Sequence, residues 1–195
     1  YANRIITLGV LVLGIGTLAL MALTPVLMRI VFDDTFFDPA LTQPRDSAQL
    51  LMLLCLPQVF FYGMFVLAGQ VLNARGRFGP MMWAPIVNNV VACAVVIVYA
   101  FVFGTSLSVK GFTTTQSLVL GLGSTGAIAL QALVLLPYLR RAGFHFRPRF
   151  DFRGVGLRHT ARLAVWTLLF IVVNQVAYIV VVKLATGATA SAAID

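Results

Sequence analysis

The sequence predicts an all-α polytopic membrane protein that crosses the bilayer with five helices. Sixty per cent of the 195 residues are hydrophobic and only 10% are charged, whereas a soluble domain has about half and about a quarter. The mean hydropathy is +0.96. Five nearly uncharged runs are also long enough to cross roughly 30 Å of hydrocarbon at about 1.5 Å per residue. Because lipid offers the backbone no hydrogen bonds, such runs fold as helices.

The predicted spans are residues 5–31, 50–72, 81–103, 117–139 and 163–185. An acidic loop (32–49) follows the first span, a short turn (73–80) the second, a polar loop (104–116) the third and a long basic segment (140–162) the fourth. The chain starts at Tyr1 and stops shortly after an apolar run. We therefore expect it to be part of a longer protein.

The basic residues predict the direction of the spans, because cytoplasmic flanks carry an excess of Lys and Arg. With the N-terminal end inside, that side holds Arg4, Arg75, Arg77, Arg140, Arg141, Arg147, Arg149, Arg153, Arg158 and Arg162. The outer side holds Arg29, Arg45, Lys110 and Lys183. We expect the N-terminal end inside, the C-terminal end outside, and topology rather than nucleic-acid binding as the reason for the net charge of +8.

Four of the five spans contain an internal proline, which removes one helical hydrogen bond and tends to kink the helix. The hinge candidates are Pro25, Pro57, Pro85 and Pro137. Ordinary packing irregularity is the alternative to hinges that bend around a cavity.

Amide side chains within the spans predict a polar interior, since an amide that faces lipid has no partner. They are Gln70, Asn73, Asn88, Asn89, Gln131, Asn174 and Gln175. The alternative for any one of them is a single interhelical hydrogen bond.

The basic segment contains FHFRPRFDFR at residues 144–153, in which aromatic and mostly basic residues alternate. This pattern suits a strip in the cytoplasmic headgroup layer. A plain positive-inside anchor is equally consistent with it. The interfacial linker residues are Arg140, Arg141, Arg147, Arg149, Arg153, Arg158 and Arg162.

Residues for enzymatic chemistry are missing from the sequence. No Asp or Glu lies in the middle of a span, and no nucleophilic triad, zinc-protease motif or phosphate-binding loop occurs. His145 and His159 are too isolated to be metal ligands, and Cys55 and Cys93 lie in apolar runs, where a thiol behaves as a small hydrophobe. We expect neither an enzyme nor a metal site.

The turn NARGRFGP places Asn73, Arg75 and Arg77 at the cytoplasmic mouth of a helical hairpin, with Asn88 and Asn89 about two turns deeper. The surrounding run LPQVFFYGMFVLAGQVLNARGRFGPMMWAPIVNNVV, residues 56–91, resembles the signature of the MurJ/MviN family of lipid II flippases in its actinobacterial form. The matching positions are Pro57, Leu72, Asn73, Phe78, Pro85 and Asn88.

Members of this family are similar to the wider MOP exporters and have fourteen transmembrane helices, arranged in two six-helix lobes with two extra helices at the end. The resemblance implies that the chain provides helices three to seven. Residues 1–139 would belong to the N-terminal lobe, 140–162 would be the cytoplasmic linker, and 163–195 would hold the first helix of the C-terminal lobe.

The resemblance also implies alternating access that carries undecaprenyl-linked lipid II across the bacterial cytoplasmic membrane. The candidates for its substrate cavity or gate are Asn73, Arg75, Arg77, Asn88, Asn89, Asn174 and Gln175. Some family members bind sodium through a carboxylate on the seventh helix, but residues 163–185 contain none. No cofactor is expected. Whether a cation is coupled to transport, and which one, is left open.

Two alternatives are a polysaccharide-lipid exporter of the same superfamily and a membrane scaffold that recruits cell-wall synthesis proteins through the basic segment. The expected partners are lipid II, membrane lipids and, for the scaffold, those proteins.

Overall fold

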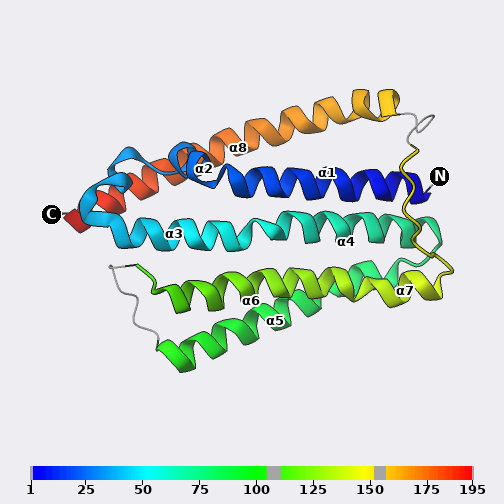
Figure 1. Ribbon diagram of the computed structural model, residues 1–195, viewed down its shortest axis with the longest axis horizontal. Helices are drawn as coiled ribbons and strands as arrows, with labels where there is room; N and C mark the ends of the chain where they lie inside the picture. Colours follow the sequence, from blue (N-terminus) through cyan, green and yellow to red (C-terminus); the bar gives the residue numbers. More distant parts are fainter. Residues whose placement is uncertain (1, 105–110, 152–156, 195) are drawn as a thin grey trace.

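The computed structural model describes residues 2–104, 111–151 and 157–194, and within these ranges it contains helices and no strand (Figure 1). The elements in chain order are α1 (Ala2–Ala22), α2 (Thr24–Val31), the 3₁₀ turns η1 (Asp34–Phe37) and η2 (Pro39–Leu41), α3 (Thr42–Cys55), α4 (Pro57–Ala74), α5 (Gly79–Phe103), α6 (Thr114–Leu133), α7 (Leu135–Arg141) and α8 (Leu157–Ile194).

Five segments in the described ranges are long and apolar enough to cross a membrane, which confirms the predicted fold class. They are Ala2–Ala22, Pro39–Ala74, Gly79–Phe103, Thr114–Arg141 and Leu169–Ala188. Figure 1 shows that successive crossings run in opposite directions, so that the ends of the helices gather at two ends of the bundle.

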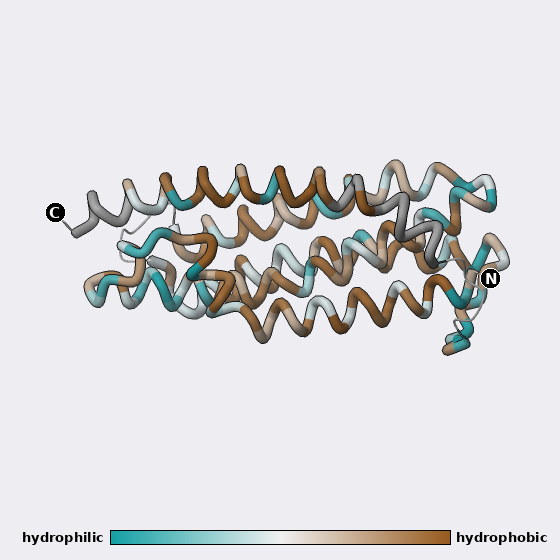
Figure 2. Tube along the Cα trace, turned by 90° about the horizontal axis from the view of Figure 1, so that it is seen from above, coloured by the Kyte–Doolittle hydropathy of each residue, from teal (hydrophilic) through white to brown (hydrophobic). Residues whose placement is uncertain are grey.

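The surface of the bundle is apolar along the helices. Large side chains such as Ile15 (66% exposed), Met82 (80%) and Phe101 (87%) point outward. Figure 2 shows hydrophobic residues along the helices and hydrophilic residues mostly toward the two ends. An outward apolar belt between polar ends is what a lipid bilayer solvates.

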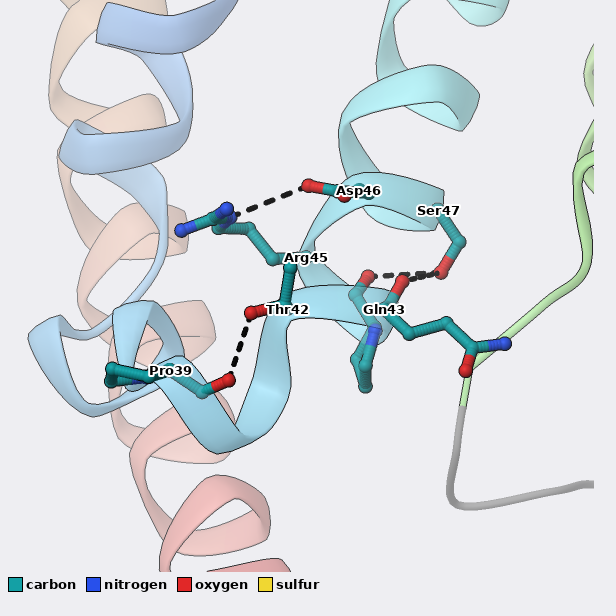
Figure 3. A network of polar contacts seen from close by, with 7 residues as sticks. Pro39, Thr42, Gln43, Arg45, Asp46 and Ser47 are labelled. Atoms are coloured by element: carbon teal, nitrogen blue, oxygen red, sulfur yellow. Dashed lines mark hydrogen bonds and ion pairs between the residues drawn. The ribbon is translucent and has the colours of Figure 1, made fainter.

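The second crossing begins earlier than predicted, because α3 starts at Thr42 and takes in residues expected in the acidic loop. Pro44 fits there, since the first turn of a helix has no use for its missing N–H. Local polar contacts hold this turn (Figure 3): the Thr42 hydroxyl donates to the Pro39 carbonyl at 2.8 Å, and Arg45 pairs with Asp46 at 3.5 Å. The Ser47 hydroxyl donates to carbonyls one turn back. The helix therefore begins in polar sequence, ahead of the predicted apolar span.

The last helix is also longer than the predicted 163–185, and its main contacts are with α2 and η1. The Asp33 N–H donates to the Thr186 hydroxyl at 3.3 Å, which joins the start of η1 to α8. The backbone N–H and the hydroxyl of Thr35 both donate to the Asp33 carboxylate and lower its pKa.

Three crossings are interrupted beside a proline. The breaks lie at Leu23, two residues before Pro25, at Leu56, directly before Pro57, and at Val134, three residues before Pro137. The fourth candidate, Pro85, lies inside an unbroken α5. Whether the interrupted helices bend during a functional cycle stays a prediction.

Thr24 compensates for the proline in the first crossing. Pro25 has no N–H to donate to the Met21 carbonyl four residues back. The Thr24 hydroxyl donates to that carbonyl at 2.7 Å, and Thr24 is only 2% exposed. A side-chain hydroxyl thus satisfies the carbonyl that the proline frees.

Replacing Thr24 with Val is expected to lower the free energy of unfolding by about 1 kcal/mol, because the Met21 carbonyl loses the donor that the Thr24 hydroxyl provides. Thr24→Ser keeps the hydroxyl and should stay near the parent protein. Denaturant titration of the purified full-length protein measures both. Equal stability of Thr24→Val and Thr24→Ser would contradict this role.

Candidate functional site at the basic end of the bundle

Five of the arginines predicted to share the cytoplasmic side lie at one end of the bundle, here called the basic end. Arg4 stands at the start of α1, Arg75 and Arg77 lie in the α4–α5 turn, and Arg140 and Arg141 end α7. The chain after α7, residues 142–151, is here called the linker segment. Figure 1 shows it crossing this end of the bundle beside the N-terminus.

A glycine turn directs the linker segment back onto the bundle. Gly143 has φ +73°, a left-handed conformation that glycine adopts without strain. The Phe144 N–H donates to the Leu139 carbonyl at 2.9 Å, which closes the turn after α7. A Cβ at Gly143 would also lie 3.3 Å from the guanidinium of Arg75. Both backbone geometry and space therefore favour glycine here.

Phe144 enters the core as a result of this turn and is only 7% exposed. The core cluster lies at the basic end and combines residues of α1, α4, α5, α6 and α7, namely Ile6, Phe65, Ala68, Leu72, Ala84, Ala132, Leu135 and Leu139. Phe146 and Phe150 are 48% and 68% exposed. The aromatic residues of the linker segment therefore do not form one uniform strip in the headgroup layer, because the first of them packs inside the bundle.

Backbone and side-chain contacts fasten the linker segment to α1. The Arg149 N–H donates to the buried Thr7 hydroxyl at 3.1 Å, and that hydroxyl donates to the Asn3 carbonyl at 2.7 Å. The Arg147 N–H lies 3.4 Å from the Asn3 side-chain oxygen. Arg4 and Asp151 form an ion pair at 2.7 Å. The first two turns of α1 thus hold the second half of the linker segment, residues 147–151.

Arg75 ties the α4–α5 turn to the same segment. Its guanidinium donates a hydrogen bond to the Ala142 carbonyl and lies 5.5 Å from the centre of the Phe144 ring, within cation–π range. Gly76, at φ +70°, allows the turn that presents this side chain. The side chain of Arg77 is exposed, and in the part of the chain that the structure describes it makes no hydrogen bond or ion pair. The structure therefore separates the roles of two arginines that the sequence treats alike.

The predicted cavity amides do not gather in one place. Asn73 is half-buried and its amide lies 3.4 Å from the sulfur of Met81. Asn88 is half-buried on α5, and Asn89 is exposed beside it. Asn174 and Gln175 are exposed on α8, whose main contacts are with α2 and η1. The described residues do not bring the α8 amides to those of α4 and α5.

Those of the remaining basic residues that the structure describes lie on the surface. Arg140, Arg141, Arg147 and Arg149 are exposed, and Arg141 lies 5.9 Å from the centre of the Tyr138 ring. Arg153 and the side chains of Arg158 and Arg162 lie outside the described residues. Among the residues that are described, no group of three His, Cys, Asp or Glu side chains could hold a metal ion.

A polar cluster between α3, α4 and α6 was missed by the sequence analysis. The Gln58 amide donates to the hydroxyls of Ser124 at 3.0 Å and Thr125 at 3.2 Å. The Thr125 hydroxyl donates to the Leu54 carbonyl at 2.7 Å. Gln58 follows Pro57 directly, so the cluster lies where the second crossing is interrupted. The Thr125 hydroxyl of α6 thus donates to the Leu54 carbonyl at the end of α3, where the helix is interrupted.

Close packing of α3 on α6 supports this cluster. A Cβ at Gly121 would lie 2.6 Å from the Cβ of Leu54, so only glycine permits this approach. A signal was present in the sequence: a glutamine directly after a proline in one span, and a Ser-Thr pair in the middle of another. Such residues re-satisfy backbone groups at broken membrane helices.

Comparison with known proteins agrees with this architecture. The family model described as "Lipid II flippase MurJ" matches residues 1–194. A curated protein of Haemophilus influenzae named "Probable lipid II flippase MurJ" is 26% identical over 145 residues, which cover 74% of this chain and 26% of that protein. The chain thus spans about a quarter of the length of this relative. No solved structure matches. Because the family model covers nearly every residue, the chain belongs to the lipid II flippase MurJ family.

Proposed function

We propose that the protein containing this chain moves lipid II, an undecaprenyl-linked cell-wall precursor, across the bacterial cytoplasmic membrane. The match of the family model to residues 1–194 carries this proposal. The name of the Haemophilus influenzae relative supports it. The work of the chain is then transport rather than catalysis, and its substrate is a lipid with a diphosphate and a large polar headgroup.

The mechanism we propose is alternating access between two lobes, with this chain providing helices three to seven. Three of its crossings are interrupted near prolines, and interrupted helices are common where transporters form a site and change shape. The linker segment would lead from the first lobe into the second. Its attachment to α1 and to Arg75 would then couple the first lobe to the motion of the second.

We also propose that the basic end faces the cytoplasm. The positive-inside rule supports this orientation, since described arginines from α1, the α4–α5 turn and α7 lie at that end. Arginines there would attract the diphosphate of the substrate before it enters the membrane.

Complementation tests the proposed substrate. The full-length protein is expressed in a bacterium whose own lipid II flippase is depleted, and the lipid II that reaches the outer leaflet is measured with an enzyme added from outside. We expect growth and outer-leaflet lipid II to be restored. If the protein inserts normally and a different lipid-linked sugar accumulates in its own host upon depletion, the protein exports another lipid.

A further inference from the structure

An apolar cleft of about 200 Å³ lies at the basic end between α1, α4, α6, α7 and the linker segment. Its walls include Ile6 of α1, Phe60 of α4, Leu133 of α6 and Phe146 of the linker segment. All thirteen lining residues have hydrocarbon or thioether side chains, so nothing in the cleft pairs with a polar ligand atom.

A second hollow, of about 380 Å³, adjoins this cleft and has a cationic rim. The two share Leu136, Leu139, Phe144 and Phe146 as walls. The second hollow adds Arg140 and His145. The apolar cleft therefore opens into a hollow that the side chains of Arg140 and His145 line at the polar end of the bundle.

These two hollows fit a molecule with a hydrocarbon chain at one end and an anion at the other. The cleft offers a ligand no polar side chain. A polar ligand would lose its hydrogen bonds there, whereas an acyl chain has none to lose. The rim offers a guanidinium, which pairs well with phosphate.

We propose that the cleft binds one acyl chain of an anionic phospholipid and that Arg140 binds its phosphate. Arg140 is exposed and lines the second hollow. The neighbouring arginines are placed differently: Arg75 already donates to the Ala142 carbonyl, and Arg141 lies against Tyr138. A phospholipid bound in the two hollows contacts Phe144 and therefore touches the linker segment directly.

Photo-crosslinking tests the site in the full-length protein. The protein is placed in nanodiscs of phosphatidylcholine with a minor fraction of phosphatidylglycerol that carries a photoreactive acyl chain, and crosslinked peptides are identified by mass spectrometry. We expect crosslinks on the peptides that line the cleft, and stronger ones than a photoreactive phosphatidylcholine gives. Arg140→Gln should reduce them about fivefold, because glutamine has no charge to pair with the phosphate in the second hollow. Arg141→Gln removes the same charge one residue away and should leave them unchanged.

Three results would overturn this proposal. Equal crosslinking by phosphatidylglycerol and phosphatidylcholine would mean ordinary boundary lipid. Equal losses in Arg140→Gln and Arg141→Gln would mean general attraction to a charged surface. Stronger competition by a polyprenyl diphosphate than by unlabelled phosphatidylglycerol would assign the cleft to the transported lipid. None of these results depends on whether the protein flips lipid II, because binding alone is measured.

Discussion

Replacing Arg75 with Ala is expected to reduce lipid II flipping several-fold and to lower the free energy of unfolding by about 1 kcal/mol. The change removes the hydrogen bond to the Ala142 carbonyl and the cation–π contact with Phe144, both of which hold the linker segment to the α4–α5 turn. Flipping in the complemented strain and denaturant titration of the purified full-length protein provide the two measurements. Membrane abundance is compared by immunoblot.

Arg77→Ala is the matched control, since it removes the same charge from the same turn. Arg77 is exposed and makes no such contacts in the described residues, so its loss should leave flipping and stability nearly unchanged. Arg75→Lys should be intermediate, because an ammonium keeps the charge and loses the planar fork. Equal effects of Arg75→Ala and Arg77→Ala would show that the contacts of Arg75 with the linker segment contribute nothing beyond the charge of the turn.

Replacing Thr125 with Val is expected to destabilise the protein by about 1–2 kcal/mol. The hydroxyl donates to the Leu54 carbonyl at the break before α4 and accepts from Gln58, so its loss removes the donor to that carbonyl and one of the two hydrogen bonds that the Gln58 amide donates. Thr125→Ser should be close to the parent protein. Thr115→Val, at an exposed position near the start of the same helix, controls for the substitution itself.

A double-mutant cycle separates the cluster from general packing. If Gln58 and Thr125 interact as described, Gln58→Leu combined with Thr125→Val should cost less than the two single changes together. Additive losses would show that the two side chains act independently and that the cluster does not hold the broken helix.

The crossings could be predicted from the sequence because the bilayer imposes a minimum apolar length on each of them. The ends of the helices could not be predicted in this way, because the requirement for apolar residues applies only within the hydrocarbon layer. The turn from Thr42 to Ser47 is polar and was expected in a loop, yet local hydroxyl and ion-pair contacts continue the helix there. α8 likewise extends beyond its apolar run.

The site was harder to predict, because its contacts join residues that are far apart in the chain. Arg75 and Arg77 differ only in what lies opposite them, and the linker segment reaches Arg75 through the turn at Gly143. The alternation of aromatic and basic residues after Gly143 gave no sign that Phe144 enters the core. Gln58 and Thr125 are far apart in the chain and meet where the second crossing packs against α6, whose Gly121 allows the close approach of Leu54. The hydropathy of the sequence does not reveal these long-range contacts.

The most direct test of the attachment of the linker segment to the bundle is a crosslink between Asn3→Cys and Arg147→Cys. Both changes are made in the full-length protein after its own cysteines, including Cys55 and Cys93, have been replaced. The Asn3 side-chain oxygen and the Arg147 N–H lie 3.4 Å apart, so a short bifunctional maleimide should join the two thiols in most molecules. An absence of crosslink, with the cysteine at position 147 fully reactive toward a water-soluble maleimide, would show that the segment lies away from α1 and would contradict the account.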